Sequence, residues 1–223
     1  MFNKSLFQYD SENHLGYYKG KLIPSATQIC DILYPLDDAI PEDKLKKAAK
    51  HGTSVHSFIE DINNIIREKG LYRTLKEDID MFNDTNETEV VDYFALLNTY
   101  QLVPYDFEQL VFLLDDNDEP ICYGHYDLVV KATQDIGPFT KDNLYMVDLK
   151  TTSVFAKKKT ALQTAIYRAG YRQTGNGYCE LQTFGIHLRD GVRLIPLEEM
   201  PEKELLPLVK GLRGVFDARR ENN

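Results

Sequence analysis

The chain has 223 residues, of which 43% are hydrophobic and 27% are charged, which is ordinary for a globular protein with a sizeable core. No apolar stretch approaches the roughly 20 residues that span a bilayer, and the N-terminus lacks a signal peptide's apolar core, so we expect a cytoplasmic protein with no membrane partner. The net charge of −9 argues mildly against a nucleic-acid partner, because phosphate binding usually leaves a basic footprint.

The local distribution of charge matters more than its sum. Acidic residues gather at 115–119 and at Glu198 and Glu199, whereas basic residues follow the segment Asp148–Lys150, namely Lys157, Lys158, Lys159, Arg168 and Arg172. This pattern allows a basic rim beside an acidic pocket. The three cysteines, Cys30, Cys122 and Cys179, are too few and too widely spaced for a disulfide framework or a cysteine-ligated zinc site.

The N-terminal region is predicted to contain a short strand over 15–23 and a short helix over 24–35. Pro24 and Ser25 suit the start of that helix, and Pro35 suits its end. Ser25 and Thr27 fit two roles, since hydroxyls at a helix N-terminus either cap the helix or contact a phosphate.

A long helix is predicted from Pro41 to Gly70. Its apolar residues recur at helical spacing, at Val55, Phe58, Ile59, Ile62, Ile65 and Ile66. His56 and Glu60 lie four residues apart, so both project from one face of the helix. A histidine in this setting is either a structural residue or a metal ligand.

The polar segment 71–86 is predicted as a loop with a short helical piece, and 87–102 as a second long helix ended by Pro104. A strand from Phe107, the turn 115–120 and a strand around Tyr123 then form a hairpin. Glu108 enters the sheet near the start of the first strand. It is interpreted either as a further acidic group near a cation or as a solvated strand-end residue.

Two strands between Tyr123 and Thr151 are joined by a loop that contains Gly137 and Pro138. Asp127 lies ten residues before Gly137 and Asp148 lies ten residues after Pro138, which makes the two carboxylates approximate cross-strand neighbours. Asp148 and Lys150 share one strand face. Mg²⁺ and Mn²⁺ take carboxylate oxygens, so this patch predicts a cation site, with a surface salt bridge as the alternative.

A helix beginning near Thr160 places Gln163 and Tyr167 one turn apart, where they either contact an unpaired nucleotide or pack in a helix interface. Strands at 180–188 and 191–196, joined by Arg-Asp-Gly, and a helix over 197–219 complete the chain. We expect a single α/β domain with a mixed central sheet flanked by helices. An N-terminal helical part would cover about 1–104, the catalytic sheet and Gln/Tyr helix about 105–197, and the C-terminal helix about 198–223.

Four motifs occur in a characteristic order: G-T-S-V-H-S-F-I-E on a helix, G-H-Y-D and D-L-K on strands, and Q-T-A-I-Y on a helix. Together they resemble the PD-(D/E)XK nuclease superfamily, and most of all its RecB-type exonuclease branch. The segment P-S-A-T-Q-I-C-D-I-L also resembles the entry segment of phage nucleases and of the mitochondrial genome maintenance exonuclease. The resemblance implies a restriction-endonuclease-like core with an N-terminal helical elaboration.

The resemblance also implies roles for individual residues. Asp127, Asp148 and Lys150 would be catalytic, and one or two Mg²⁺ or Mn²⁺ ions would be bound by His56, Asp127, Asp148 and the Leu149 backbone carbonyl. Glu60 and Glu108 would stand outside the direct ligands. The residues expected to contact DNA are Gln163, Tyr167, Ser25, Thr27, Thr151, Lys157 and Lys158.

The function that the resemblance implies is a metal-dependent DNA exonuclease in phage or bacterial recombination, replication or repair. Its DNA would carry a free end, with single strands included, and a recombinase or single-strand-binding protein would be a further partner. A structure-specific or nicking endonuclease on the same core and a non-catalytic DNA-binding module are the alternatives. We expect no iron–sulfur cluster, because only three cysteines are present, and no bound nucleotide, because no Walker motif is present.

Overall fold

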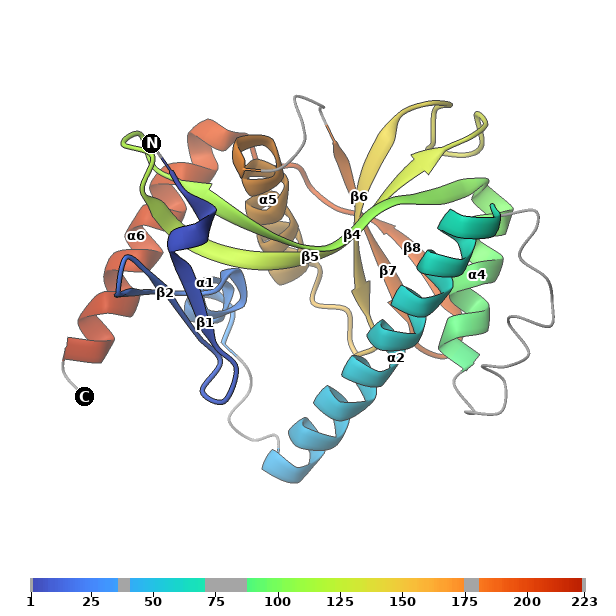
Figure 1. Cartoon of the computed structure of the whole chain (residues 1–223). Helices are drawn as coiled ribbons and strands as arrows, with labels where there is room; N and C mark the ends of the chain where they lie inside the picture. The colour runs from blue at the N-terminus through green and yellow to red at the C-terminus, as the bar shows by residue number, and fades with distance from the viewer. Residues whose placement is uncertain (1, 36–40, 71–87, 175–180, 222–223) are drawn as a thin grey trace.

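The hairpin-forming strands that the sequence predicts assemble into the central sheet of the protein. The structure is a computed structural model that describes residues 2–35, 41–70, 88–174 and 181–221 (Figure 1). Five strands lie in the order β4-β5-β6-β7-β8: β4 (Leu102–Leu114), β5 (Pro120–Ala132), β6 (Leu144–Lys150), β7 (Gln182–Leu188) and β8 (Val192–Pro196). Only β6 and β7 are parallel neighbours, because α5 crosses between them. The predicted mixed α/β sheet is confirmed.

Helices cover both faces of this sheet (Figure 1). On one face α2 (Glu42–Lys69) and α4 (Thr88–Tyr100) bury apolar side chains against the strands, and the α2 residues Val55, Ile59, Ile62 and Ile66 follow the helical period. On the other face lie α1 (Ala26–Leu33), α5 (Lys157–Thr174) and α6 (Glu202–Glu221), which form a second core. The sheet therefore separates two apolar layers.

The N-terminal region differs from the prediction. A 3-10 turn, η1 (Lys4–Leu6), precedes a second sheet of three antiparallel strands: β1 (Phe7–Asp10), β2 (Leu15–Tyr18) and β3 (Lys21–Ile23). The single strand predicted over 15–23 is wrong, because Lys19 and Gly20 adopt φ values of 50° and 74° and turn the chain between β2 and β3. The part of the chain before residue 104 is thus not only helical.

Several predicted boundaries also move. The second long helix ends at Tyr100, and Pro104, expected to end it, lies inside β4. Because β4 is an edge strand, a residue without a backbone N–H is tolerated there. Helix α5 begins at Lys157 and α6 at Glu202. The loop predicted over 71–86 lies outside the described residues.

No helix in the described ranges combines the length and the apolar character needed to cross a membrane. Cys30 and Cys122 are buried free thiols, and burial raises the pKa of Cys30 to about 12. They behave as small core residues, as predicted, whereas Cys179 lies outside the described part of the chain.

Candidate metal centre

The strand register brings three carboxylates from β4, β5 and β6 into one row. Phe107 pairs with Leu128 and Gln109 with Tyr126, so Glu108 and Asp127 lie between these pairs, opposite each other. The last paired residues of the β5–β6 ladder are Leu128, which follows Asp127, and Val147, which precedes Asp148, so the two aspartates form the next pair of positions. The predicted cross-strand proximity of Asp127 and Asp148 follows from this register. It also brings Glu108 into the row as a third carboxylate.

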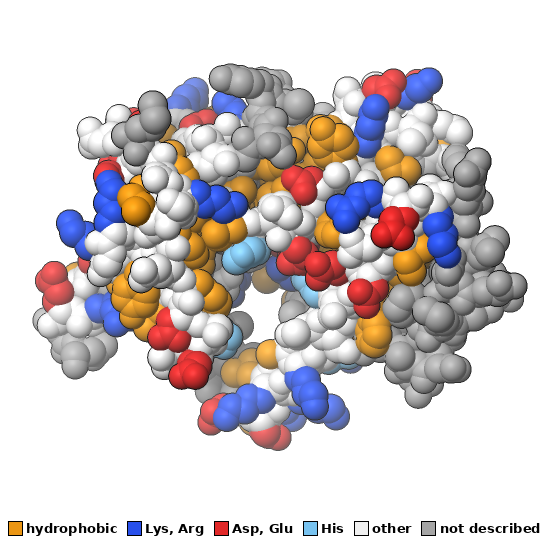
Figure 2. Space-filling view, viewed as in Figure 1, with side chains coloured by type: hydrophobic (Ala, Val, Ile, Leu, Met, Phe, Trp, Pro, Cys, Tyr) orange, Lys and Arg blue, Asp and Glu red, His pale blue; other side chains and the backbone are white. Residues whose placement is uncertain are grey.

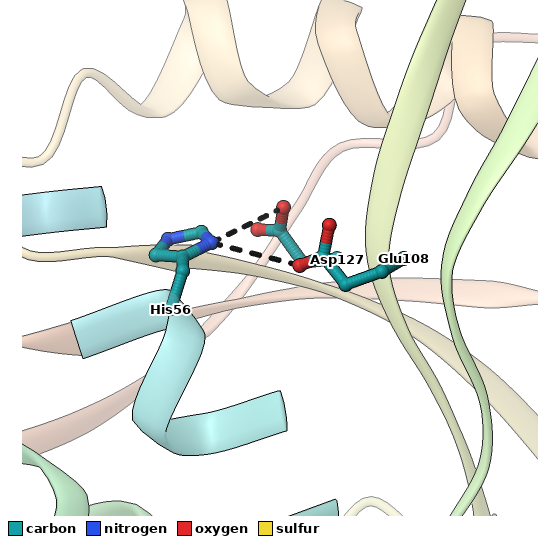
Figure 3. A group of neighbouring side chains, drawn as sticks. All are labelled: His56, Glu108 and Asp127. Atoms are coloured by element: carbon teal, nitrogen blue, oxygen red, sulfur yellow. Dashed lines mark ion pairs between the residues drawn. The ribbon is translucent and has the colours of Figure 1, made fainter. Parts of the chain in front are cut away.

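His56 approaches this row from α2 and, with Glu108 and Asp127, forms a group whose potential ligand atoms all lie within 4.8 Å of one another. Its Nδ1 atom is 3.7 Å from Asp127 Oδ1 and 3.8 Å from Glu108 Oε1. Figure 3 shows the imidazole pointing at both carboxylates from the opposite side. One nitrogen and two carboxylate oxygens that converge in this way can bind a divalent cation.

The backbone at Glu108 is strained. Glu108 has a φ of 50°, in the left-handed region that non-glycine residues seldom adopt within a strand. Its carboxylate also faces Asp127 directly across the ladder, and like charges in that position destabilise a sheet. Both costs become understandable if a cation joins the two carboxylates. Glu108 is therefore placed among the direct ligand candidates, whereas the sequence suggested a more distant role.

Asp148 occupies the most enclosed position of the row. Its side chain is 2% exposed, and apart from the Lys150 ammonium no group of the described residues donates a hydrogen bond to either carboxylate oxygen. The Lys150 ammonium lies 2.8 Å from Asp148 Oδ2 as an ion pair. A buried carboxylate with acceptor positions left unused is costly, so its oxygens are suited to bind a further cation. Asp148 stands outside the three-residue group of Figure 3 and borders it.

The charges of the site shift the pKa values of its members. Burial lowers the pKa of His56, but the carboxylates of Asp127 and Glu108 outweigh this effect and raise the pKa to about 9. Burial raises the pKa of Asp148 to about 6, opposed by the Lys150 ammonium and reinforced by Asp127. In the absence of a cation, His56 is thus protonated at neutral pH and partly neutralises the carboxylates.

Lys150 is held by a hydrogen-bond network that extends into α5. Its ammonium donates to Gln163 Oε1 over 3.4 Å, and Gln163 Nε2 donates to the Tyr167 hydroxyl over 2.7 Å and to Thr27 Oγ1 over 3.2 Å. Both Gln163 and Tyr167 are buried. The resemblance associates them with DNA contact and with support of the active site. Their hydrogen bonds place them behind Lys150, and their contact with DNA stays a prediction.

Three further residues with predicted roles are Ser25, Leu149 and Glu60. Ser25 caps α1, and its hydroxyl accepts from the Gln28 backbone N–H, which is the capping role considered for it. The Leu149 backbone N–H donates to Asp127 Oδ2 over 2.6 Å, and the ligand role of its carbonyl stays a prediction. Glu60 is exposed on α2 and stands outside the His56 group.

The predicted basic rim is only partly formed. Lys159 pairs with Asp31, while Arg168 and Arg172 pair with Glu199 and Glu202 at a separate hollow of about 790 Å³. Lys157 and Lys158 are exposed at the start of α5. Of the five basic residues, three are thus held by ion pairs.

A groove of about 1350 Å³ opens at the candidate metal centre. It is lined by α2, by the segment 149–153 that follows β6 and by the turn between β7 and β8, with Glu108, Lys150 and Thr151 at its inner end. Figure 2 shows acidic side chains and a histidine gathered at the centre of this face, where the surface is hollowed beside α2. Sequence reasoning missed the basic residues of this groove, since they come from segments with no shared motif.

The fold and the site define a mixed α/β protein with an acidic candidate metal centre in an open groove. The chain matches no protein-family model and no curated protein. Its function must therefore be argued from the geometry of this site together with the sequence motifs.

Proposed function

We propose that this protein is a Mg²⁺- or Mn²⁺-dependent deoxyribonuclease that hydrolyses phosphodiester bonds, acting as an exonuclease. The observation that carries the proposal is Asp148, a buried carboxylate whose Oδ1 accepts no hydrogen bond from the described residues. Its Oδ2 lies 2.8 Å from the ammonium of Lys150, a residue that lines the groove. A purely structural ion pair would satisfy its oxygens with hydrogen bonds. Asp148 is better explained as one part of an incomplete centre that a cation completes.

The side chains present fit such a cation. Glu108, Asp127 and Asp148 supply the oxygen ligands that Mg²⁺ and Mn²⁺ prefer, and His56 adds a nitrogen that Mn²⁺ accepts readily. When bound there, a divalent cation would lower the pKa of a coordinated water and offset the charge of a scissile phosphate. The open groove leaves room for the phosphate on the solvent side of the row.

Lys150 is suited to stabilise charge near the reacting phosphate. Burial lowers the pKa of its ammonium, but Asp148 and Asp127 raise it further, so the net shift is upward and the group stays protonated. Asp148 and Gln163 fix the ammonium from two sides. A fixed cation of this kind orients the attacking water and compensates the developing negative charge without having to reorganise.

End-labelled linear DNA, single-stranded and double-stranded, and a closed circular control would test the proposal in the presence of Mg²⁺, Mn²⁺ or EDTA. Wild type is compared with Asp148→Asn and Lys150→Ala, each of which is expected to lower the rate by about 100-fold or more. Asp116→Asn is the matched control, because Asp116 forms an exposed ion pair with Lys210 away from the groove.

Metal-dependent loss of linear DNA alone, abolished in both site variants and retained in Asp116→Asn, is the expected result. Cleavage of the closed circular DNA would show instead that the same centre acts as an endonuclease. If folded wild type cleaves no substrate with either metal, the enzymatic proposal fails and a DNA-binding module takes its place.

A further inference from the structure

The groove continues beyond the metal centre along α2, toward the N-terminal end of that helix. Lys44 and Lys47 line it there, and Arg189 lines it from the turn between β7 and β8. These three side chains are exposed and form no ion pair with the described residues. None of them belongs to a motif that the sequence suggested as functional.

The helical period places the two lysines on the groove side of α2. Lys44 and Lys47 are separated by three residues and lie on one face, together with Ala48, whereas Lys46 is rotated by about 200° from Lys44 and points elsewhere. Lys46 is accordingly absent from the groove lining and pairs with Glu42 over 2.7 Å. Lys47 thus faces the groove and its neighbour Lys46 does not, so a substitution of Lys46 is a matched control.

The inner part of the groove is narrow, because α2 and the segment after β6 approach each other at Gly52. A methyl group at Gly52 would lie 3.2 Å from Thr151 Oγ1, closer than ordinary contact. Ala48 and Gly52 line the groove between the lysines and His56, and only residues this small fit where α2 approaches Thr151. Leu45 and His51 also line the groove, so a strand that follows α2 would pass beside these larger side chains.

Charge changes sign along this path. The outer end carries Lys44, Lys47 and Arg189, and the inner end carries Glu108 and Lys150, which lie next to Asp127 and Asp148. Between them, Glu89 Oε1 and His51 Nε2 are hydrogen-bonded over 3.0 Å. Glu60 also lines the groove, on the far side of His56 from the lysines.

We propose that Lys44, Lys47 and Arg189 bind the phosphates of a DNA strand whose scissile phosphate lies at the carboxylate row. The inference rests on the proposed function and extends it, because it names the path of the strand and the side chains that hold it. Figure 2 shows lysine side chains over the N-terminal end of α2, at the lower edge of the hollowed face. The acidic protein as a whole repels DNA, so cations along this groove would direct the strand to it.

The distance between the lysines and the metal centre determines which phosphates of the strand the lysines contact. Twelve residues separate Lys44 from His56, which is about 18 Å along the helix. At about 3.4 Å per phosphate along one strand of a duplex this spans about five nucleotides, and fewer in a stretched single strand. Lys44 therefore acts on phosphates several nucleotides from the scissile bond and has no partner in a dinucleotide.

The test measures binding and cleavage for wild type, Lys44→Ala/Lys47→Ala and the control Lys46→Ala. Binding of a long fluorescent single-stranded oligonucleotide is followed by anisotropy in Ca²⁺ at several salt concentrations. Loss of two phosphate contacts is expected to weaken binding about tenfold and to reduce the slope of log K against log salt by about 1.4. Cleavage of the same oligonucleotide and of a dinucleotide is then measured with Mn²⁺.

The double variant should lose activity on the oligonucleotide and keep that of wild type on the dinucleotide, while Lys46→Ala resembles wild type on both. If the double variant and Lys46→Ala have equal salt slopes, Lys44 and Lys47 do not bind phosphates, and the proposed path of the strand fails even if wild type cleaves DNA. Equal losses on both substrates would also overturn it, because they would indicate a disturbed metal centre. A further outcome is that the salt slope differs between wild type and the double variant as predicted while wild type cleaves neither substrate. That result would contradict the nuclease proposal and would still support the proposed path of the strand.

Discussion

Glu108 shows how a single residue can be unfavourable for the fold and useful for a site. Its left-handed backbone and its position opposite Asp127 both cost stability when no cation is bound. Such costs persist where the surrounding structure enforces them, and they concentrate at functional sites. The same carboxylate that weakens the empty centre would strengthen cation binding.

Glu108→Gln is therefore expected to separate stability from metal affinity. The metal-free variant should unfold at a temperature close to that of wild type, because the removed repulsion from Asp127 and the removed attraction to protonated His56 oppose each other. Its Mn²⁺ affinity should fall by at least about tenfold, since even residues behind metal ligands contribute that much. Thermal unfolding in EDTA and calorimetric titration with Mn²⁺ measure the two effects, with Glu60→Gln as the comparison from the same groove.

The pKa of His56 predicts how cation binding depends on pH. Burial lowers this pKa, but Asp127 and Glu108 raise it to about 9, so a cation must displace a proton from His56 at neutral pH. Affinity should therefore rise by up to about tenfold per pH unit as pH increases from 7 to 8.5. His56→Gln should remove this dependence, and an equally steep rise in that variant would contradict the assignment.

The same shift has a consequence for the metal-free fold. Because the folded pKa lies above the ordinary value of 6.5, His56 contributes stability that is fully present below pH 6.5 and is lost as pH rises through about 9. The size of this contribution is on the order of 2 to 3 kcal/mol. Urea unfolding in EDTA at pH 7 and pH 10 should show this loss in wild type and a much smaller one in His56→Gln.

At the scale of elements, α5 supports the strand that carries Lys150. Gln163 and Tyr167 lie one turn apart, and the hydroxyl of Tyr167 accepts from the amide whose oxygen faces the ammonium. Tyr167→Phe is expected to lower kcat for DNA cleavage about tenfold with little change in KM, because it releases a positioning hydrogen bond. In a Lys150→Ala background the same substitution should have no further effect, and additive losses would show that Tyr167 acts independently of Lys150.

Close contact between α5 and β5 depends on Gly124. A Cβ atom at this position would collide with the Tyr167 ring. Gly124→Ala is therefore expected to cost about 1 to 3 kcal/mol in the free energy of unfolding and to reduce activity with it. Gly211→Ala in α6, where no atom lies within 4 Å of a new Cβ, should instead stabilise by about 0.5 to 1 kcal/mol. Chemical unfolding of both variants measures the contrast.

Local patterns explain which elements the sequence could predict. Helix α2 has a long apolar period and a glycine at its end, and the Arg-Asp-Gly turn identifies the β7–β8 hairpin. The turn at Lys19 and Gly20 lacks the usual Asn-Gly or Asp-Gly signal, so β2 and β3 were read as one strand. Pro104 was read as a helix stop because a sequence does not show that a strand will lie at a sheet edge.

At the scale of the whole molecule, the sheet joins segments that are remote in sequence. Asp127 and Asp148 could be paired from the sequence because both are equally far from one turn. Glu108 could not be placed opposite Asp127 without the register of the β4–β5 hairpin. Lys44 and Arg189 lie far apart in the chain and share the groove only through the packing of α2 beside the sheet. Such sites depend on tertiary structure, which single-sequence patterns do not contain.

The central claim is that the carboxylate row and His56 hold a divalent cation. The most direct measurement is anomalous diffraction from crystals soaked in Mn²⁺, with crystals of Asp127→Asn as the comparison. The account predicts an anomalous peak in contact with Asp127 and at least one of His56, Glu108 and Asp148, and its loss in the variant. A well-occupied peak elsewhere, or no peak at this row when Mn²⁺ has access to the groove, would contradict it.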